Sequence, residues 1–256
     1  MAENEVGMYG SKDYEIQSLE LINSGGQSID LRSIFVELQI FQDIYSSVMN
    51  GNIVVTDGND VFSNFYFVGN EYLRIKIDKP GLGRPLERMF RVYKSSDRHP
   101  QNDSGQMYTL HFCSDELISS NQILVSKSYK SSKVKDVVSD ILVKELNIDS
   151  SRIYKLENSS GNFDFIIPNY RPFEAIQWVT GRAYDQKKFC YFFFENKNGF
   201  NLTSMQTLIK QKPYKTIKYE LKNVDRDPAN NKDSIDKFEI LTDFDMLNSK
   251  IGRAHV

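Results

Sequence analysis

The sequence contains few of the side chains that most often hold metals or carry out covalent chemistry. Among its 256 residues there are two cysteines, three histidines and one tryptophan. Cys113 and Cys190 lie far apart, with no CxxC spacing and no histidine cluster that would complete a metal site. We therefore expect two reduced thiols in the core, and no metal ion or other cofactor.

Long apolar runs and an excess of one charge are also missing. The 32 Lys and Arg residues against 34 Asp and Glu residues give a net charge of −2, so no overall basic field predicts nucleic-acid binding. The N-terminal "MAENEVGMYGSKDYE" lacks the basic start and apolar stretch of a secretory signal, and no run reaches the ~18 apolar residues of a membrane span. We expect a soluble protein made in a cytoplasm, with no stable membrane binding.

Alternating apolar residues dominate the first half of the chain. From Ser33, the aliphatic residues recur at every second position, which is the period of a strand: Ile34, Val36, Leu38 and Ile40 alternate with Phe35, Glu37, Gln39 and Phe41. Further strand-like segments are "NIVVTDG", closed by an Asp-Gly turn, then "EYLRIKID", "RMFRVYKSSDR" and "QMYTLHFCSDE". Short strands separated by turns predict a small antiparallel barrel or sandwich over residues 1–125.

The pattern then changes to helical spacing. In "SSKVKDVVSDILVKELNI" the apolar residues recur as on one face of a helix, with Ser131 or Ser132 as the expected N-cap. In "NFDFIIP" a strand follows, which we expect Pro168 to end because proline cannot donate to a ladder. Pro172 suits the first turn of the next helix.

The stretch "DFIIPNYRPFEAIQWVTGRA" is thus predicted to be a corner between a strand and a helix. The following "KFCYFFFENKNGFNLTS" predicts a hairpin turning at Asn198-Gly199. We expect "FCYFFF" to be a buried central strand under its helix, with Trp178 in the core, rather than an aromatic ligand cradle. These segments form an α+β domain over 126–213, and a third, strand-like unit begins at 214–250. The fold class is α+β, mainly β.

No catalytic group can be nominated from the sequence. The histidines are His99, His111 and His255, no Gly-x-Ser-x-Gly elbow accompanies them, and His111 alternates within a strand as a structural residue would. The acid pairs Asp57 with Asp60 and Asp115 with Glu116 could serve a glycosidase in principle. Their spacing is also typical of turns and strand ends, which we favour.

Three short segments are weak candidates for ligand binding. "KPGLGRP" lacks the complete dinucleotide fingerprint and lies between strands, so we expect a hairpin loop. "DRDPANNKD" places Asp225, Asp227 and Asn230 at calcium-loop spacing, but it has Ala229 at the fifth position and no glycine, which favours a solvated loop. The basic run Lys127–Lys135, with Tyr129 in it, could touch phosphates but is more typical of a solvated helix start. We nominate no catalytic, cofactor-binding or metal residue, and expect a structural protein rather than an enzyme.

Two stretches carry a resemblance to a known family. The first is "FVELQIFQDIYSSVMNGNIVVTDGNDVFSNFYFVGNEYLRIKI", Phe35–Ile77, with its strands, Gly51, Asp57-Gly58 and Gly69-x-Glu71. The second is "NFDFIIPNYRPFEAIQWVTGRA" continued by "YFFFENKNGFNLTSMQTLI". In this order they resemble the baseplate hub proteins of contractile-tailed, T-even-like bacteriophages, and the resemblance covers nearly the whole chain.

The resemblance implies a fold and a set of partners. The first unit would be a tube-forming barrel, 214–250 the start of a second one, and the α+β domain would pack outside a ring of three subunits. Such a virion protein, assembled in the bacterial host cytoplasm, would template the tail tube, anchor the central spike and meet baseplate wedge proteins. DNA would pass through its lumen only in transit. No contact residue is carried over from the resemblance.

The chain departs from the family in length. The last six residues, "IGRAHV", can be spelled ATC GGA AGA GCA CAC GTC, which is similar to the start of a common short-read sequencing adapter. We therefore expect residues 251–256 to be an artefact and the second barrel to be truncated. The rival interpretations are a late-control-D-like hub from another contractile injection system and, from a different class, a tail-associated cell-wall hydrolase.

Overall fold

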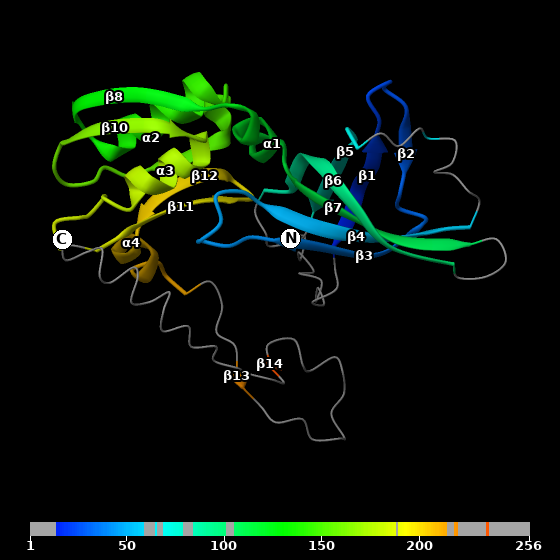
Figure 1. Cartoon of the computed structure of the whole chain (residues 1–256). Coiled ribbons are helices and arrows are strands. Elements are labelled where there is room, and N and C mark those ends of the chain that lie inside the picture. The colour runs from blue at the N-terminus through cyan, green and yellow to red at the C-terminus, as the bar shows by residue number, and fades with distance from the viewer. Residues whose placement is uncertain are drawn as a thin grey trace, which may run out of the picture.

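The computed structural model describes residues 14–58, 65, 69–78, 84–100, 105–187, 189–213, 218–219 and 234–235. Two bodies lie side by side in it (Figure 1). We call residues 14–114 the sheet body and residues 115–213 the α+β body. None of the helices in the described ranges is long and apolar enough to cross a membrane.

The sheet body is one curled antiparallel sheet. Its order among the described residues is β2-β1-β5-β6-β7-β4-β3. The strands are β1 (Glu15–Ile22), β2 (Ser28–Asp30), β3 (Phe35–Phe41), β4 (Asn50–Asp57), β5 (Tyr72–Asp78), β6 (Leu86–Pro100) and β7 (Gln106–Ser114). Figure 1 shows β1 and β5 running steeply across the direction of β3 and β4, so the sheet wraps around its own inner face. The predicted α+β, mainly β class is confirmed.

The inner face of this sheet holds the first core. Leu19, Ile53, Leu73, Phe90 and Phe112 are almost fully buried there, at 0 to 1% exposure. The rings of Phe90 and Phe112 lie 4.9 Å apart between centroids. Such alternating burial is what the period-two pattern predicted, because successive side chains of a strand point to opposite faces.

Gly51 lets two strands approach this core. A Cβ atom at Gly51 would lie 2.2 Å from the carbonyl oxygen of Gln39 and 2.5 Å from Cζ of Phe112. Both distances are far inside van der Waals contact, so no larger residue fits without moving β3 or the phenyl ring.

The α+β body follows along the chain. Its elements are α1 (Asp115–Gln122), β8 (Val125–Ser132), α2 (Val134–Asp140), a π-helical turn (Ile141–Glu145), a 3-10 turn (Ser150–Arg152), β9 (Ile153–Leu156), β10 (Phe163–Tyr170), α3 (Pro172–Thr180), β11 (Tyr191–Asn196), β12 (Gly199–Ser204) and α4 (Met205–Ile209). β10 pairs with β8, and a second small sheet has the order β11-β12-β9. Beyond them, β13 (Lys218–Tyr219) and β14 (Ser234–Ile235) pair in parallel.

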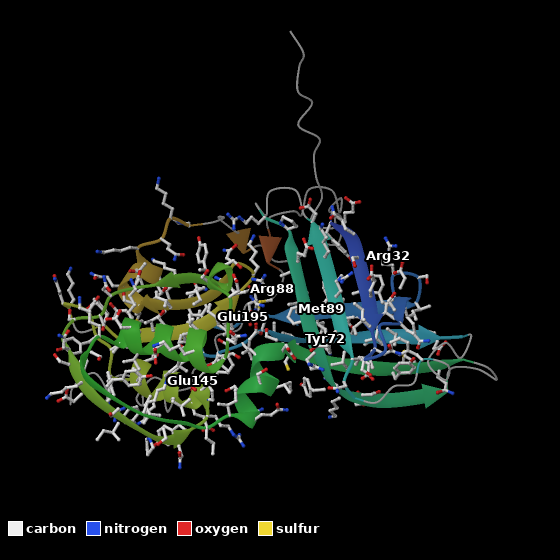
Figure 2. All side chains as sticks on the ribbon, turned by 90° about the horizontal axis from the view of Figure 1, so that it is seen from above. Arg32, Tyr72, Arg88, Met89, Glu145 and Glu195 are labelled. Carbon is white, nitrogen blue, oxygen red and sulfur yellow. The ribbon has the colours of Figure 1, made fainter. Side chains whose placement is uncertain are left out.

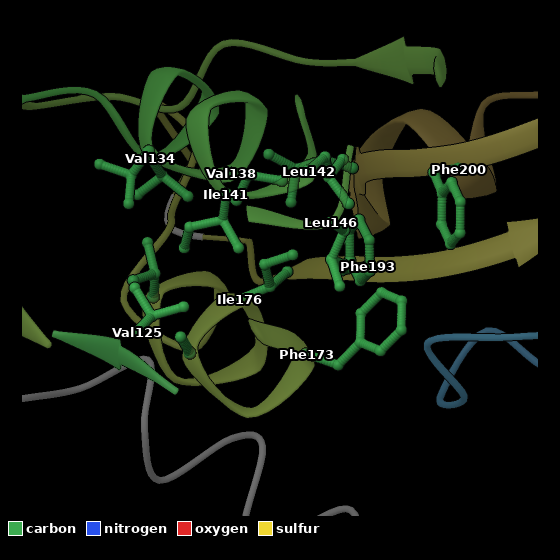
Figure 3. Packing of buried hydrophobic residues seen from close by; sticks show 14 of the residues in the cluster. Val125, Val134, Val138, Ile141, Leu142, Leu146, Phe173, Ile176, Phe193 and Phe200 are labelled. Atoms are coloured by element: carbon green, nitrogen blue, oxygen red, sulfur yellow. The ribbon is translucent and has the colours of Figure 1, made fainter. Parts of the chain in front are cut away.

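The second core lies between these helices and strands. Side chains from α2, α3, β11 and β12 meet there, as Figure 3 shows for Val138, Ile176, Phe193 and Phe200. The rings of Phe193 and Phe200 are stacked with centroids 5.9 Å apart. The hairpin and the start of α3 at Pro172 agree with the sequence prediction.

Two predicted boundaries are wrong. Helix α2 begins at Val134 with Lys133 at the N-cap, because Ser131 and Ser132 belong to β8 and Ser131 adopts a φ of 47°. Strand β10 continues through Pro168 to Tyr170. Proline is tolerated there because the ladder with β8 is irregular between Ile167 and Tyr170, so no regular donor is required at that position.

The aromatic strand is buried but is not central. The side chains of Tyr191–Phe194 are all buried in β11, yet β11 lies at the edge of its small sheet, and β12 is the central strand. Trp178 packs edge-to-face against Phe165 and Tyr170, with centroids 6.0 Å apart in both pairs. The stretch from Asp164 to Ala183 therefore forms the predicted corner between a strand and a helix.

Replacing Gly51 tests the close approach in the first core. We expect Gly51→Ala to lower the free energy of unfolding by roughly 1–3 kcal/mol, because the new methyl group overpacks against Phe112. Gly58→Ala is the matched control, since nothing lies within 4 Å of a Cβ at Gly58. Urea denaturation would measure both, and equal midpoints for the two variants would contradict this account.

Candidate functional site at the junction of the two bodies

A buried carboxylate joins the two bodies. Glu195 lies on β11, and its side chain is 0% exposed. The backbone N–H of Met49 donates to its Oε2 at 3.0 Å, and the hydroxyl of Ser114 donates to the same oxygen. Both donors belong to the sheet body. Figure 2 shows Glu195 where the two bodies meet.

Arg152 occupies the other side of this carboxylate. Its Nη2 lies 2.7 Å from Oε1 of Glu195, and its Nη1 lies 2.9 Å from Oε1 of Glu116 on α1. One guanidinium therefore bridges two carboxylates, which is the fork geometry that arginine provides and lysine does not. Its side chain is only 24% exposed, so these contacts are largely shielded from water.

Arg88 supplies a second cation from the sheet body. It lies on β6 and donates from Nη2 to the backbone carbonyl of Lys197 at 3.0 Å. Burial, followed by the nearby Arg152, lowers the pKa of the Arg88 guanidinium, while Glu195 and Glu116 raise it. We call Arg88, Glu116, Arg152 and Glu195 the charge quartet. Its two cations balance its two anions, as a partly buried cluster around the buried Glu195 requires.

The carboxyl group of Glu116 is subject to opposing electrostatic effects. Burial raises its pKa above the usual value, Arg152 lowers it, and the neighbouring charge of Glu195 raises it again. Desolvation exceeds the attraction of the shared arginine, because Arg152 must also neutralise Glu195. The charged form of Glu116 therefore depends on Arg152 staying within ion-pair distance, at 2.9 Å.

Apolar and neutral polar contacts extend the junction. Val48, from the loop between β3 and β4, is a member of the second core. In the same loop, Ser47 accepts a hydrogen bond from Nε2 of Gln177 on α3 at 2.9 Å. The ring of Tyr45 packs edge-to-face on Phe192 with centroids 5.6 Å apart. The loop thus fastens the sheet body to both α3 and β11.

The hydrogen bonds of this arrangement run between the two bodies. Glu195 has no exposed side-chain surface, so no substrate atom reaches it from solvent. Asp115, the other half of one predicted acid pair, pairs instead with Arg91 at 2.8 Å. Within the described ranges, no cluster of His, Cys, Asp and Glu could hold a metal ion.

One pair of side chains escaped the sequence analysis. Nε2 of His111, on β7, lies 2.7 Å from Oγ of Ser96 on β6. Ser96 also donates to Oδ2 of the adjacent Asp97, so the carboxylate contacts the serine and not the imidazole. A hydrolytic triad needs the acid on the histidine, where it orients the ring. The pair became visible only through the pairing of β6 with β7, because its members are 15 residues apart.

The remaining candidates lie elsewhere. Asp57 is buried at the end of β4, whereas Asp60, Asp225, Asp227, Asn230, His255 and most of "KPGLGRP" lie outside the described residues, and the side chain of His99 is not described. The basic run is not the predicted helix start, because Lys127–Ser132 lie in strand β8 and helix α2 begins only at Val134. Lys127 pairs with Asp140 and Glu145 on α2 and the π-helical turn. Cys113 and Cys190 are free thiols, and burial raises the pKa of Cys113 to about 12.

One feature of the sequence indicates the position of the charge quartet. Glu195 is the only charged residue in the apolar run "FCYFFFEN", and a charge inside such a run indicates a buried partner. Its partners could not be named, since Ser114 and Met49 lie 81 and 146 residues away along the chain.

Comparisons with known proteins find similarity in structure only. No protein-family model and no curated protein matches the sequence. The 43 kDa tail protein of prophage MuSo2 from Shewanella oneidensis has a TM-score of 0.47 and 10% identity, over 73% of this chain and 54% of that one. A tail protein from Neisseria meningitidis MC58 has a TM-score of 0.47 and 11% identity, over 76% and 50%. The E. coli c3393 protein, a type VI secretion component, has a TM-score of 0.44 and 8% identity, over 77% and 48%. The chain spans about half the length of these structures.

Neutralising Glu195 tests the junction. We expect Glu195→Gln to lower the free energy of unfolding by roughly 2–3 kcal/mol, because the partly buried Arg152 would lose its fully buried anionic partner and keep only Glu116. Glu145→Gln is the control, since Glu145 pairs with Lys127 away from the junction (Figure 2) and its loss should change stability by about 1 kcal/mol or less. Urea denaturation compares the two variants. Equal losses would show that the quartet has no special role.

The pH dependence tests Glu116. Its folded pKa is raised, so the folded state binds this proton more tightly than the unfolded state does. As pH falls from 7 towards 4.5, the wild-type protein should therefore gain stability relative to Glu116→Gln, which has no carboxyl group to protonate. Urea midpoints for both proteins at pH 7, 6 and 5 would measure the difference. A difference that stays constant or shrinks on acidification would contradict the assignment.

Proposed function

We propose that the chain is a structural protein of a contractile phage tail, acting in the baseplate as the hub that templates the tail tube and anchors the central spike. The observation that carries the proposal is the junction of the two bodies at Glu195, a buried carboxylate of one body that accepts hydrogen bonds from Met49 and Ser114 of the other. Each body contains one of the two stretches that resemble the hub family, Phe35–Ile77 in the sheet body and Asn162–Ala183 in the α+β body.

The physical demands of that role fit the junction. A baseplate component must keep its surfaces in a fixed relative orientation while partners bind to different faces. Glu195 accepts donors from both bodies, and Val48 inserts from one body into the core of the other. Separating the bodies would remove two of the donors to this carboxylate, the Met49 amide and the Ser114 hydroxyl, which is costly. The two bodies therefore present their surfaces as one unit.

The partners of the proposed hub follow from the same role. Three copies would close into a ring, as symmetric oligomers commonly do, with tail tube protein, central spike protein and wedge proteins around it and DNA in transit through its lumen. The location would be the virion tail, after assembly in the host cytoplasm. A hub-like component of another contractile injection system would use the same junction with a different tube and spike.

A cell-wall hydrolase is the second candidate, because one observation favours it. Ser96 and His111 are in hydrogen-bond contact on strands β6 and β7. We assign no catalytic role to them, since Asp97 contacts the serine instead of orienting the histidine. Clearing of peptidoglycan by the purified chain, lost in His111→Ala, would establish the hydrolase and overturn the structural assignment.

Immunogold electron microscopy of intact particles tests the proposed location. Antibodies raised against the purified chain should label the baseplate end of contractile tails, where the tube and spike meet. A tube or sheath antibody on the same particles serves as the positional control. Labelling along the tail shaft or on the capsid, or no labelling of particles whose lysate contains the protein, would reject the hub.

A further inference from the structure

A row of polar side chains crosses the outer face of the sheet body. The strand register pairs its members in the order Gln39 on β3, Asn52 on β4, His111 on β7 and Lys94 on β6, four strands that lie side by side in Figure 1. We call these four residues the outer row. Leu110 and Phe112, on either side of His111, are buried in the first core, so the row faces the other way. With neighbouring strands about 4.8 Å apart, the row is about 14 Å long.

Strand β6 is irregular on both sides of its contact with His111. Its pairing with β7 shifts within Val92–Lys94 and again within Ser96–His99. In the second shift, Asp97 adopts a φ of 56°, a left-handed conformation that few residues other than glycine enter. Bulges re-aim side chains and recur beside functional sites, as strained backbone does. The outer row therefore lies next to a part of β6 that departs from regular sheet geometry twice.

The two shifts bring three side chains of β6 to His111. The ring of Tyr93 lies against the imidazole, with centroids 6.3 Å apart and planes inclined at 44°. Oγ of Ser96 lies 2.7 Å from Nε2 of His111 and donates to Oδ2 of Asp97 at 2.8 Å. Because the serine proton points to Asp97, the serine oxygen accepts from Nε2–H, and Nδ1 of the neutral ring is an acceptor. Tyr93 is 52% exposed, so about half of its surface faces solvent beside the row.

Asn52 adds an acceptor whose hydrogen bonding is incomplete. Its Oδ1 is shielded from water and accepts no hydrogen bond from the part of the chain that the structure describes. A shielded acceptor without a donor raises the free energy of the folded chain. A ligand hydroxyl that turned this amide outward would supply the missing bond, in the middle of the outer row.

This combination of groups matches the chemistry of a neutral sugar. A sugar hydroxyl donates and accepts at once, so it pairs with amides, imidazole and serine, which do the same. The C–H face of a sugar ring is apolar and stacks on an exposed aromatic ring such as that of Tyr93. The charges of Lys94 and Asp97 oppose each other, so the surface has no net attraction for an anion or a cation. A row about 14 Å long is about the length of a trisaccharide.

We propose that the outer row and Tyr93 bind a neutral oligosaccharide in an extended, β-linked form, with one sugar ring stacked on Tyr93 and the next ones along Asn52 and Gln39. The flat succession of strands favours an extended chain over a coiled one. The site binds the sugar without breaking a bond. It goes beyond the proposed function, because templating a tube requires no sugar ligand.

Titration with two trisaccharides tests the site. Isothermal titration calorimetry on the full chain should show that cellotriose or triacetylchitotriose binds with one site per chain. Tyr93→Ala should raise the dissociation constant at least about five-fold, because the stacking surface is lost. Tyr154→Ala is the matched control, since Tyr154 is 57% exposed on β9 of the other body and its loss should leave the constant unchanged. Circular dichroism would verify that both variants fold.

Two substitutions at His111 separate a binding role from a structural one. His111→Ala removes the planar polar group and should weaken binding, whereas His111→Gln keeps a side chain that donates to Ser96 and should restore most of the affinity. Failure of the wild-type chain to bind either trisaccharide, or equal effects of Tyr93→Ala and Tyr154→Ala, would overturn the proposal.

Two further outcomes count against a neutral sugar site. Displacement of the trisaccharide by inorganic phosphate would assign the row to an anion, and cleavage of the trisaccharide would assign it to a hydrolase. Antibody labelling of tails does not depend on sugar binding, so the hub and this site fail or stand separately.

Discussion

The relative placement of the two bodies depends on one carboxylate that is removed from water. Burial removes the water molecules that would donate hydrogen bonds to Glu195. Three groups from the two bodies donate to it instead: the Met49 amide, the Ser114 hydroxyl and the Arg152 guanidinium. A buried charge is tolerated only with such partners, so the free energy of the junction is steeply sensitive to their positions. Apolar packing alone would allow sliding, whereas directional bonds to a buried anion fix one arrangement.

The geometry around Arg152 is set by a glycine on the neighbouring strand. Gly199 begins β12 with a φ of +133°, and a Cβ there would lie 2.2 Å from the carbonyl oxygen of Arg152. The β12 backbone therefore lies directly against the backbone that carries the guanidinium. In the sequence, Gly199 is also the residue that closes the β11–β12 hairpin. A single glycine thus serves the turn and the approach that allows Arg152 to reach Glu195.

Local patterns predicted much of the fold, and contacts distant in sequence set the rest. The alternation in β3 and the glycine turn after β11 were readable, because both depend on neighbouring residues. Strand β1 was missed, since its register shifts between Ile16 and Ser18 and the alternation is broken there. The predicted end of strand β10 at Pro168 was too early. Proline is tolerated within β10 because the pairing with β8 is irregular there, and no local sequence pattern indicates that irregularity.

The site is harder to predict than the fold, for the same physical reason. Glu195 was visible in the sequence as a charge in an apolar run. Its role depends on hydrogen bonds from Ser114 and Met49, which approach it only in the folded chain. Strong contacts between residues that are distant in the sequence therefore hold the two bodies as one unit, and no local pattern predicts them.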